Sequence, residues 1–282
     1  MSARPASRPG RRPLSFYFLA AFFALFILFL YGPTITIAIL SFQGERGGLT
    51  FPMNGVSTYW YIDLFEEQAV GDIWGSFQRS FILGLMVMVT TVVVSVLAGL
   101  AFRRPFFGSG LVFHLVLISL IIPSILISLG VGLIFSQLEW EVHWTTSGFG
   151  SQLTWTLPFG VLIMFAVFSR FNRAYEEAAR DQGATPWQTV RFVVLPIIAP
   201  SLIGVALFGF TLSYDEFART LLTAGSRNTL PLEIYGMTTN VTTPVLYALG
   251  TLTTAFSFLI IGAALATTLI LRRRRLARAK GG

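Results

Sequence analysis

The sequence of 282 residues contains no cysteine, two histidines and one lysine. Without thiols, the chain can form neither a disulfide framework nor a thiolate metal site. His114 and His143 are too few for a histidine metal cluster, so we expect no metal site. A P-loop needs a lysine to reach the nucleotide phosphates, and Lys280 lies near the end of the chain, outside any such motif. We therefore expect neither ATP hydrolysis nor another catalytic activity, because the sequence also lacks a nucleophile elbow.

Charge is scarce as well. Charged residues make up 12% of the chain and hydrophobic residues 54%, with a mean hydropathy of +0.70. A soluble domain has roughly a quarter of its residues charged. A chain of this length cannot hide so much apolar surface from water, so the surplus must face lipid. The composition predicts a membrane protein.

The long apolar runs predict an all-α fold with six transmembrane helices. A helix needs about 20 apolar residues to cross roughly 30 Å of hydrocarbon. The predicted spans are residues 14–40, 81–102, 111–135, 153–168, 197–214 and 246–271. The first span is long and contains Gly32-Pro33, so we expect it to kink or to continue beyond the bilayer. Ser95 and Gly99 lie four residues apart in the second span and permit close helix packing.

The distribution of charge predicts that both termini are cytoplasmic, because Lys and Arg collect on that side. With this orientation, 16 of the 20 basic residues are inside and ten of the 13 acidic residues are outside. The predicted organisation is a basic tail at 1–13, a six-helix transmembrane domain at 14–271 and a second basic tail at 272–282. We interpret the second tail as an anchor to the anionic lipid of the bilayer, and we expect no nucleic-acid partner.

The cytoplasmic loop 171–196 has the pattern of a helix, a turn and a second helix. Two pairs spaced i,i+4, Arg173 with Glu177 and Glu176 with Arg180, support the first helix. Gly183 can supply the positive φ that ends it. The second helix is expected to begin at a capping box of Thr185, Pro186 and Gln188, and to end at Pro196. By physics alone, such a loop either inserts into a cleft of a partner or packs beneath its own bundle.

The loop also resembles the EAA loop of ABC-transporter permease subunits. The resemblance rests on Glu177-Ala178-Ala179, Gly183 and Leu195-Pro196 at the family spacing, with Val193 in place of Ile as the single departure. It implies an importer permease (MetI-like) fold, in which these six residues couple the chain to a separate ATPase. The implied partners are an ATPase dimer that carries ATP and Mg, a second permease subunit, different or identical, and an extracytoplasmic substrate-binding protein. The implied location is the inner membrane of a bacterium.

Three further stretches, 196–217, 228–235 and 243–249, resemble the spermidine/putrescine group of these permeases, particularly its C-type subunit. That resemblance implies a polyamine cargo and assigns its handling to Ser213, Asp215 and Glu216. The group is also similar to permeases for iron(III), sulfate, thiamine and phosphonates, which remain alternatives. Asp215 lies about 19 residues beyond Pro196, or roughly 28 Å along a helix, near the external mouth. An acid pair there can also be an ordinary interfacial feature.

The first external loop holds a weaker candidate for the substrate path, Trp60 and Tyr61, with the acids Asp63, Glu66 and Glu67 nearby. Rings and carboxylates both attract ammonium groups. Trp and Tyr also collect at membrane interfaces, and we favour this second interpretation. A rival to the importer is a self-sufficient secondary transporter. Such proteins usually place charged residues near mid-membrane, and the predicted spans have none near their centres.

Overall fold

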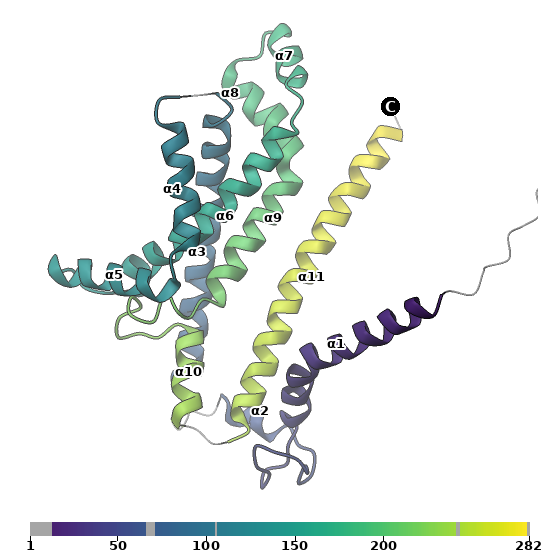
Figure 1. Ribbon diagram of the computed structural model, residues 1–282, viewed down its shortest axis with the longest axis vertical. Helices are drawn as coiled ribbons and strands as arrows, with labels where there is room; N and C mark the ends of the chain where they lie inside the picture. The colour runs from purple at the N-terminus through teal and green to yellow at the C-terminus, as the bar shows by residue number, and fades with distance from the viewer. Residues whose placement is uncertain (1–12, 66–70, 105, 241–242, 281–282) are drawn as a thin grey trace, which may run out of the picture. The chain divides into compact units, whose positions relative to one another are not determined.

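The computed structural model describes residues 13–65, 71–104, 106–240 and 243–280, and most of these residues are helical. Two π-helical turns, Trp144–Gly148 and Val190–Val194, precede α6 and α9. The α-helices in chain order (Figure 1) are α1 (Leu14–Leu40), α2 (Tyr59–Asp63), α3 (Ile73–Ala101), α4 (Ser109–Ile121), α5 (Ser124–Gln137), α6 (Phe149–Ser169), α7 (Ala174–Asp181), α8 (Pro186–Thr189), α9 (Leu195–Tyr214), α10 (Leu230–Asn240) and α11 (Val245–Lys280).

Five of these helical segments are long and apolar enough to cross a membrane, and the bent pair α4–α5 makes a sixth if it counts as one span. This confirms the predicted all-α membrane fold. The boundary at residue 271 stays a prediction, since α11 continues as a helix to Lys280. The basic residues of 1–12 lie outside the described residues.

The chain forms two compact units, and the first comprises the described residues 13–65 and 243–254. Nearly all side chains of α1 are exposed, as expected for a helix surrounded by lipid. The helix is unbroken through Pro33, but its axis bends (Figure 1), as predicted for a proline inside a helix. In the loop that follows α1, the buried Gln43 side chain accepts the Asn54 N–H at 2.7 Å.

The second unit is built around α3, α6 and α9, which pack against one another (Figure 1). Its core cluster contains Met164, Phe168, Val194, Ile198 and Val205. Gly99 allows the close approach of α3 and α6, because a Cβ at this position would lie 2.7 Å from the Phe168 ring. This agrees with the small-residue packing expected for the second span.

The third predicted span, 111–135, is wrong as a single helix. The chain instead breaks after Ile121, and α4 and α5 meet at an angle of 107°. Ile122 is extended, with a ψ of 126°, because the ring of Pro123 disfavours the helical conformation of the residue before it. The apolar run was continuous through the proline, so hydrophobicity alone could not reveal the bend.

The predicted end of a helix at Pro196 is also wrong. Residues Pro186–Tyr214 form one continuous helical segment of 29 residues. The π-helical turn Val190–Val194 lies just before the proline, which occupies the first turn of α9. In this turn the Leu195 N–H binds the Val190 carbonyl, so the α-helical hydrogen-bond pattern is already interrupted where the proline, which has no N–H, enters the helix.

The second predicted span begins earlier than residue 81, because α3 starts at Ile73. Asp72 caps this helix by accepting the Gly75 N–H at 3.0 Å, and it also pairs with Arg79 at 2.9 Å. The Arg79 side chain holds the pKa of Asp72 below its usual value. The first turns of α3 are therefore helical although they contain polar residues. A search for apolar runs leaves them out of the predicted span.

Candidate functional site

The turn between the two helices of the loop that joins α6 to α9 folds as its sequence predicts. α7 ends at Asp181, and Gly183 in the turn that follows adopts a φ of +80°. Thr185 accepts the Gln188 N–H at 3.3 Å, and the Gln188 side chain accepts the Thr185 N–H at 2.8 Å. The capping box and the glycine turn are thus confirmed. Both are local interactions, so they depend little on the rest of the fold.

The two glutamates of α7 have opposite environments. Glu176 is buried and receives both terminal nitrogens of Arg103, at 2.5 and 3.0 Å. Arg180 adds a long contact at 4.0 Å, so the predicted Glu176–Arg180 pair is present but weak. Glu177 is exposed and forms no ion pair within the described residues. The predicted Arg173–Glu177 pair is wrong, because Arg173 instead donates to the backbone carbonyl of Arg103 at 3.0 Å.

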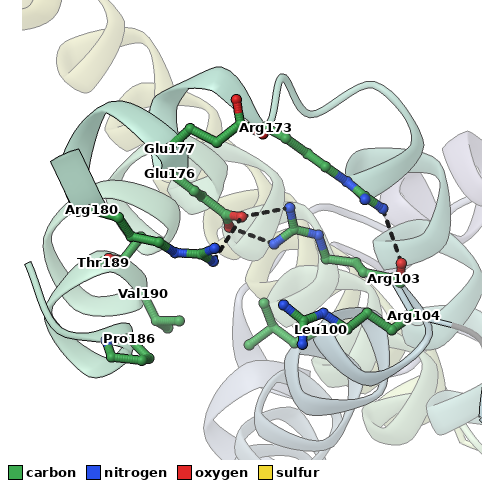
Figure 2. A pocket seen from close by; sticks show the side chains of 10 residues that line it. All are labelled: Leu100, Arg103, Arg104, Arg173, Glu176, Glu177, Arg180, Pro186, Thr189 and Val190. Carbon is green, nitrogen blue, oxygen red and sulfur yellow. Dashed lines mark hydrogen bonds and ion pairs between the residues drawn. The ribbon is translucent and has the colours of Figure 1, made fainter.

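A pocket of about 230 Å³ lies between the end of α3 and the helices α7 and α8. Figure 2 shows the guanidinium groups of Arg103 and Arg180 converging on the Glu176 carboxylate, while the carboxylate of Glu177 points away from it. The negative charge of Glu176 is therefore neutralised by arginines of the same chain. Glu177 is left available for a partner outside the chain.

The six predicted coupling residues occupy two kinds of environment. Glu177, Ala178, Gly183 and Pro196 are exposed, whereas Ala179 and Leu195 are half-buried. Two aromatic residues that the sequence analysis did not select are also exposed on this loop, Tyr175 at 55% and Trp187 at 67%. Their signal in the sequence was an aromatic side chain within an otherwise polar segment.

The candidates at the end of α9 are not equivalent. Ser213 is buried and donates a hydrogen bond to the side-chain carbonyl of Gln152 on α6. Asp215 is exposed directly after the helix, and partial burial raises its pKa above the usual value. Glu216 is buried and accepts the Arg219 N–H at 2.8 Å. Of the three, only the Asp215 carboxylate is open to a ligand without displacing an internal partner.

Arg219, which the sequence analysis did not select, is the centre of a buried network. Its guanidinium lies 3.8 Å from Glu216 and donates to Ser124 at 2.6 Å. It also donates to Thr154 at 3.2 Å and lies over the ring of Trp155 at 4.6 Å. The network joins the segment after α9 to α5 and α6. No local spacing rule could have revealed contacts between residues so far apart in the sequence.

The third candidate group lies in the first unit. Trp60 is buried, and the Tyr61 hydroxyl shares a hydrogen bond of 2.7 Å with Ser41. Asp63 is half-buried at the end of α2, while Glu66 and Glu67 lie outside the described residues. Trp60 and Tyr61 thus pack within their own unit, and a role in the substrate path stays a prediction.

Comparison with known proteins gives consistent matches. Residues 91–275 match the family model "Binding-protein-dependent transport system inner membrane component". The spermidine/putrescine transport system permease protein PotC of Escherichia coli K12 is 27% identical over 246 residues, which cover 86% of this chain and 89% of that protein. The putrescine transport system permease protein PotI of the same strain is 26% identical over 232 residues, with coverages of 79% and 81%.

Two solved structures share the fold. A chain of a bacterial ABC transporter involved in the import of alginate has a TM-score of 0.63 at 16% identity, covering 90% of this chain and 94% of its own. A chain of the MetNI methionine ABC transporter in an inward-facing form has a TM-score of 0.55 at 20% identity, covering 71% of this chain and 94% of its own. At these identities the likeness concerns the architecture of the chain.

Proposed function

Because the chain belongs to the family of inner membrane components of binding-protein-dependent transport systems, we propose that it couples transport to an ATPase through α7 and α8. In this proposal it works in a bacterial inner membrane with both termini cytoplasmic. Its partners are a dimer of ATPase subunits that bind ATP and Mg, a second permease subunit and an extracytoplasmic substrate-binding protein. The observation that carries the proposal is the exposed Glu177 carboxylate beside the small side chains of Ala178 and Ala179.

The exposed face of this loop suits insertion into a groove. Ala178 lets a partner backbone approach closely, and the free Glu177 carboxylate can pair with a cation or accept hydrogen bonds. Tyr175 and Trp187 add large exposed rings, which are common anchors in protein interfaces. The buried Glu176 fixes the orientation of the helix from behind.

A charge reversal tests the docking. Glu177→Lys should abolish retention of the ATPase on the purified membrane subunits and abolish ATP-driven uptake, while membrane insertion is unchanged. Glu45→Lys is a matched control, since Glu45 is an exposed acid in the segment after α1 and the substitution makes the same change of charge. Full uptake by the Glu177 variant would refute the docking role. Uptake by the purified chain in vesicles without an ATPase would instead support a self-sufficient transporter.

We propose that the cargo is a polyamine. Two relatives carry this cargo in their names, and the exposed Asp215 can pair with an ammonium group. Asp215 follows a cluster of packed rings formed by Phe77, Phe81, Phe210, Tyr214 and Phe256. Aromatic faces attract cations, so this end of α9 is better suited to a polycation than to an anion such as sulfate or a phosphonate.

The cargo is tested by uptake into vesicles that contain the complete complex and its binding protein. Labelled spermidine and putrescine should be imported, and iron(III), sulfate, thiamine and a phosphonate should not. Asp215→Asn should lower polyamine uptake by about tenfold, the effect of losing roughly one charge-assisted contact. Unchanged uptake kinetics would remove Asp215 from the substrate path. Import of another solute from this panel would refute the proposal that the cargo is a polyamine.

A further inference from the structure

Arg103 connects α3 to α7 by a contact that the coupling proposal does not by itself require. The Arg103 side chain is 14% exposed and its partner, Glu176, is 10% exposed. Two terminal nitrogens face two carboxylate oxygens, at 2.5 and 3.0 Å, which is the fork geometry that fixes both direction and distance. Figure 2 shows this pair crossing the space between the two helices.

Three further contacts hold the Arg103 guanidinium and its backbone in place. The guanidinium lies 5.2 Å from the ring centres of Phe168, at the end of α6, and Phe171, directly before α7. The Arg103 carbonyl accepts a hydrogen bond from Arg173 at 3.0 Å. The ends of α3 and α6 and the start of α7 therefore meet at one side chain.

The attachment of α7 to the helix bundle depends strongly on this pair. Glu176 is the only buried residue among the eight of α7. The other features that shape the loop, the Gly183 turn and the capping box of Thr185, are internal to it. The helix that ends just before Arg103, α3, packs extensively against α9 and α6. A displacement of α7 would therefore act through the Arg103–Glu176 pair on α3, and through α3 on the core of the second unit.

We propose that Arg103 is a positioning residue that transmits displacement of α7 to α3 through Glu176. This rests on the proposed function, in which an ATPase moves α7. Without the Arg103 guanidinium, α7 and its exposed face remain folded by their local contacts, so the ATPase still binds. The helix then moves without carrying α3 with it. The expected signature is ATP hydrolysis that continues while uptake falls.

The test measures uptake per ATP hydrolysed in vesicles that hold the complete complex. Arg103→Gln should retain the ATPase and hydrolyse ATP, yet lower this ratio by about tenfold, within the usual range of coupling between sites. Arg103→Lys should give a smaller loss, since an ammonium cannot form the fork. Arg104→Gln is the matched control: Arg104 is exposed, lines the same pocket and forms no ion pair within the described residues. Its ratio should not change.

A charge swap separates transmission from folding. Arg103→Glu combined with Glu176→Arg should restore a large part of the ratio that either single reversal loses, even if the single variants fold poorly. An unchanged ratio in Arg103→Gln, an equal loss in Arg104→Gln, loss of the ATPase from Arg103→Gln, or no recovery in the folded swap would overturn the proposal. If the proposed coupling function itself is wrong, the complex without substitutions does not retain its ATPase. That result is seen before any variant is measured.

Discussion

Adjacent acidic residues in this chain differ in whether their carboxylates are available to a partner. Glu176 is held by Arg103, and its neighbour Glu177 is exposed. At the other site, Glu216 is held by Arg219, and its neighbour Asp215 is exposed. In both places one carboxylate stabilises the protein and the other is open to an external group. Single substitutions can therefore separate a structural role from a functional one.

The buried Glu216–Arg219 pair predicts a stability effect. Glu216→Gln would leave the buried Arg219 without a carboxylate, although Ser124 and Thr154 still accept its hydrogen bonds. Removing one partner of a buried pair costs on the order of 3 kcal/mol. Thermal unfolding of the detergent-solubilised protein should show the loss for Glu216→Gln and a much smaller change for Asp215→Asn. Equal effects would contradict the difference in their environments.

Asp215 predicts a pH dependence of uptake. Burial raises its pKa, so the carboxylate is protonated at a higher pH than an ordinary aspartate and the native state binds that proton more tightly than the unfolded state does. Ionised Asp215 therefore costs stability at neutral pH, and this cost disappears as the pH falls through its pKa. Polyamine uptake should fall over that window on external acidification. Asp215→Asn should lack this part of the profile and unfold at a slightly higher temperature at pH 7.

At the scale of elements, prolines and glycines decide whether a helix turns, bends or continues. Pro123 separates α4 from α5, whereas Pro196 is tolerated in the first turn of α9. Both prolines lie in apolar runs, and they differ in which backbone conformation the preceding residue adopts. Ile122 is extended, with a ψ of 126°, while Leu195 is helical, with a ψ of −44°.

The Gly183 turn provides a test at this scale. A side chain at Gly183 would meet nothing within 4 Å, so its φ of +80° is the only obstacle to substitution. Gly183→Ala should destabilise the turn by about 1–2 kcal/mol, the cost of a left-handed conformation with a Cβ. Gly204→Ala on α9 is the control, because that glycine also meets open space but has no positive φ. Faster hydrogen exchange in α7 and α8 should follow only the first substitution.

At the scale of the whole molecule, the second unit is stabilised by close packing of α3, α6 and α9. Several small residues occupy the contacts between these helices, and Ser95 and Thr91 of α3 face Gly160 of α6. Lipid provides no hydrophobic force that favours helix association, so dispersion between closely fitting surfaces has to supply it. Small side chains at these positions are therefore a requirement of the membrane setting.

Gly160→Val tests this packing. The added side chain would overlap Ser95 and Thr91, and such overpacking typically costs about 1–3 kcal/mol. Gly130→Val is the control, since a Cβ at Gly130 on α5 meets nothing within 4 Å. The unfolding temperature and the yield of folded protein should fall for Gly160→Val alone. A similar fall in both variants would point to glycine flexibility instead of close packing.

Features that depend on neighbours in the sequence could be predicted from it. The apolar runs predicted the helices, and the turn at Gly183 and the capping box of Thr185 and Gln188 followed from short-range hydrogen bonding. Each of these depends on residues within a few positions of one another. The membrane class and the helix–turn–helix that begins the loop 171–196 were therefore determined by the sequence alone.

Long-range contacts decided the rest. Local spacing places an arginine four residues from each of Glu176 and Glu177, and only the approach of Arg103, 73 positions earlier, buries one of them and leaves the other exposed. In the same way, only the packing of α5 and α6 around Arg219 separates Glu216 from Asp215. The ionic partner of a carboxylate depends on which helices meet in space. That is why the tertiary structure, and not the local pattern, decided which acids are free to act.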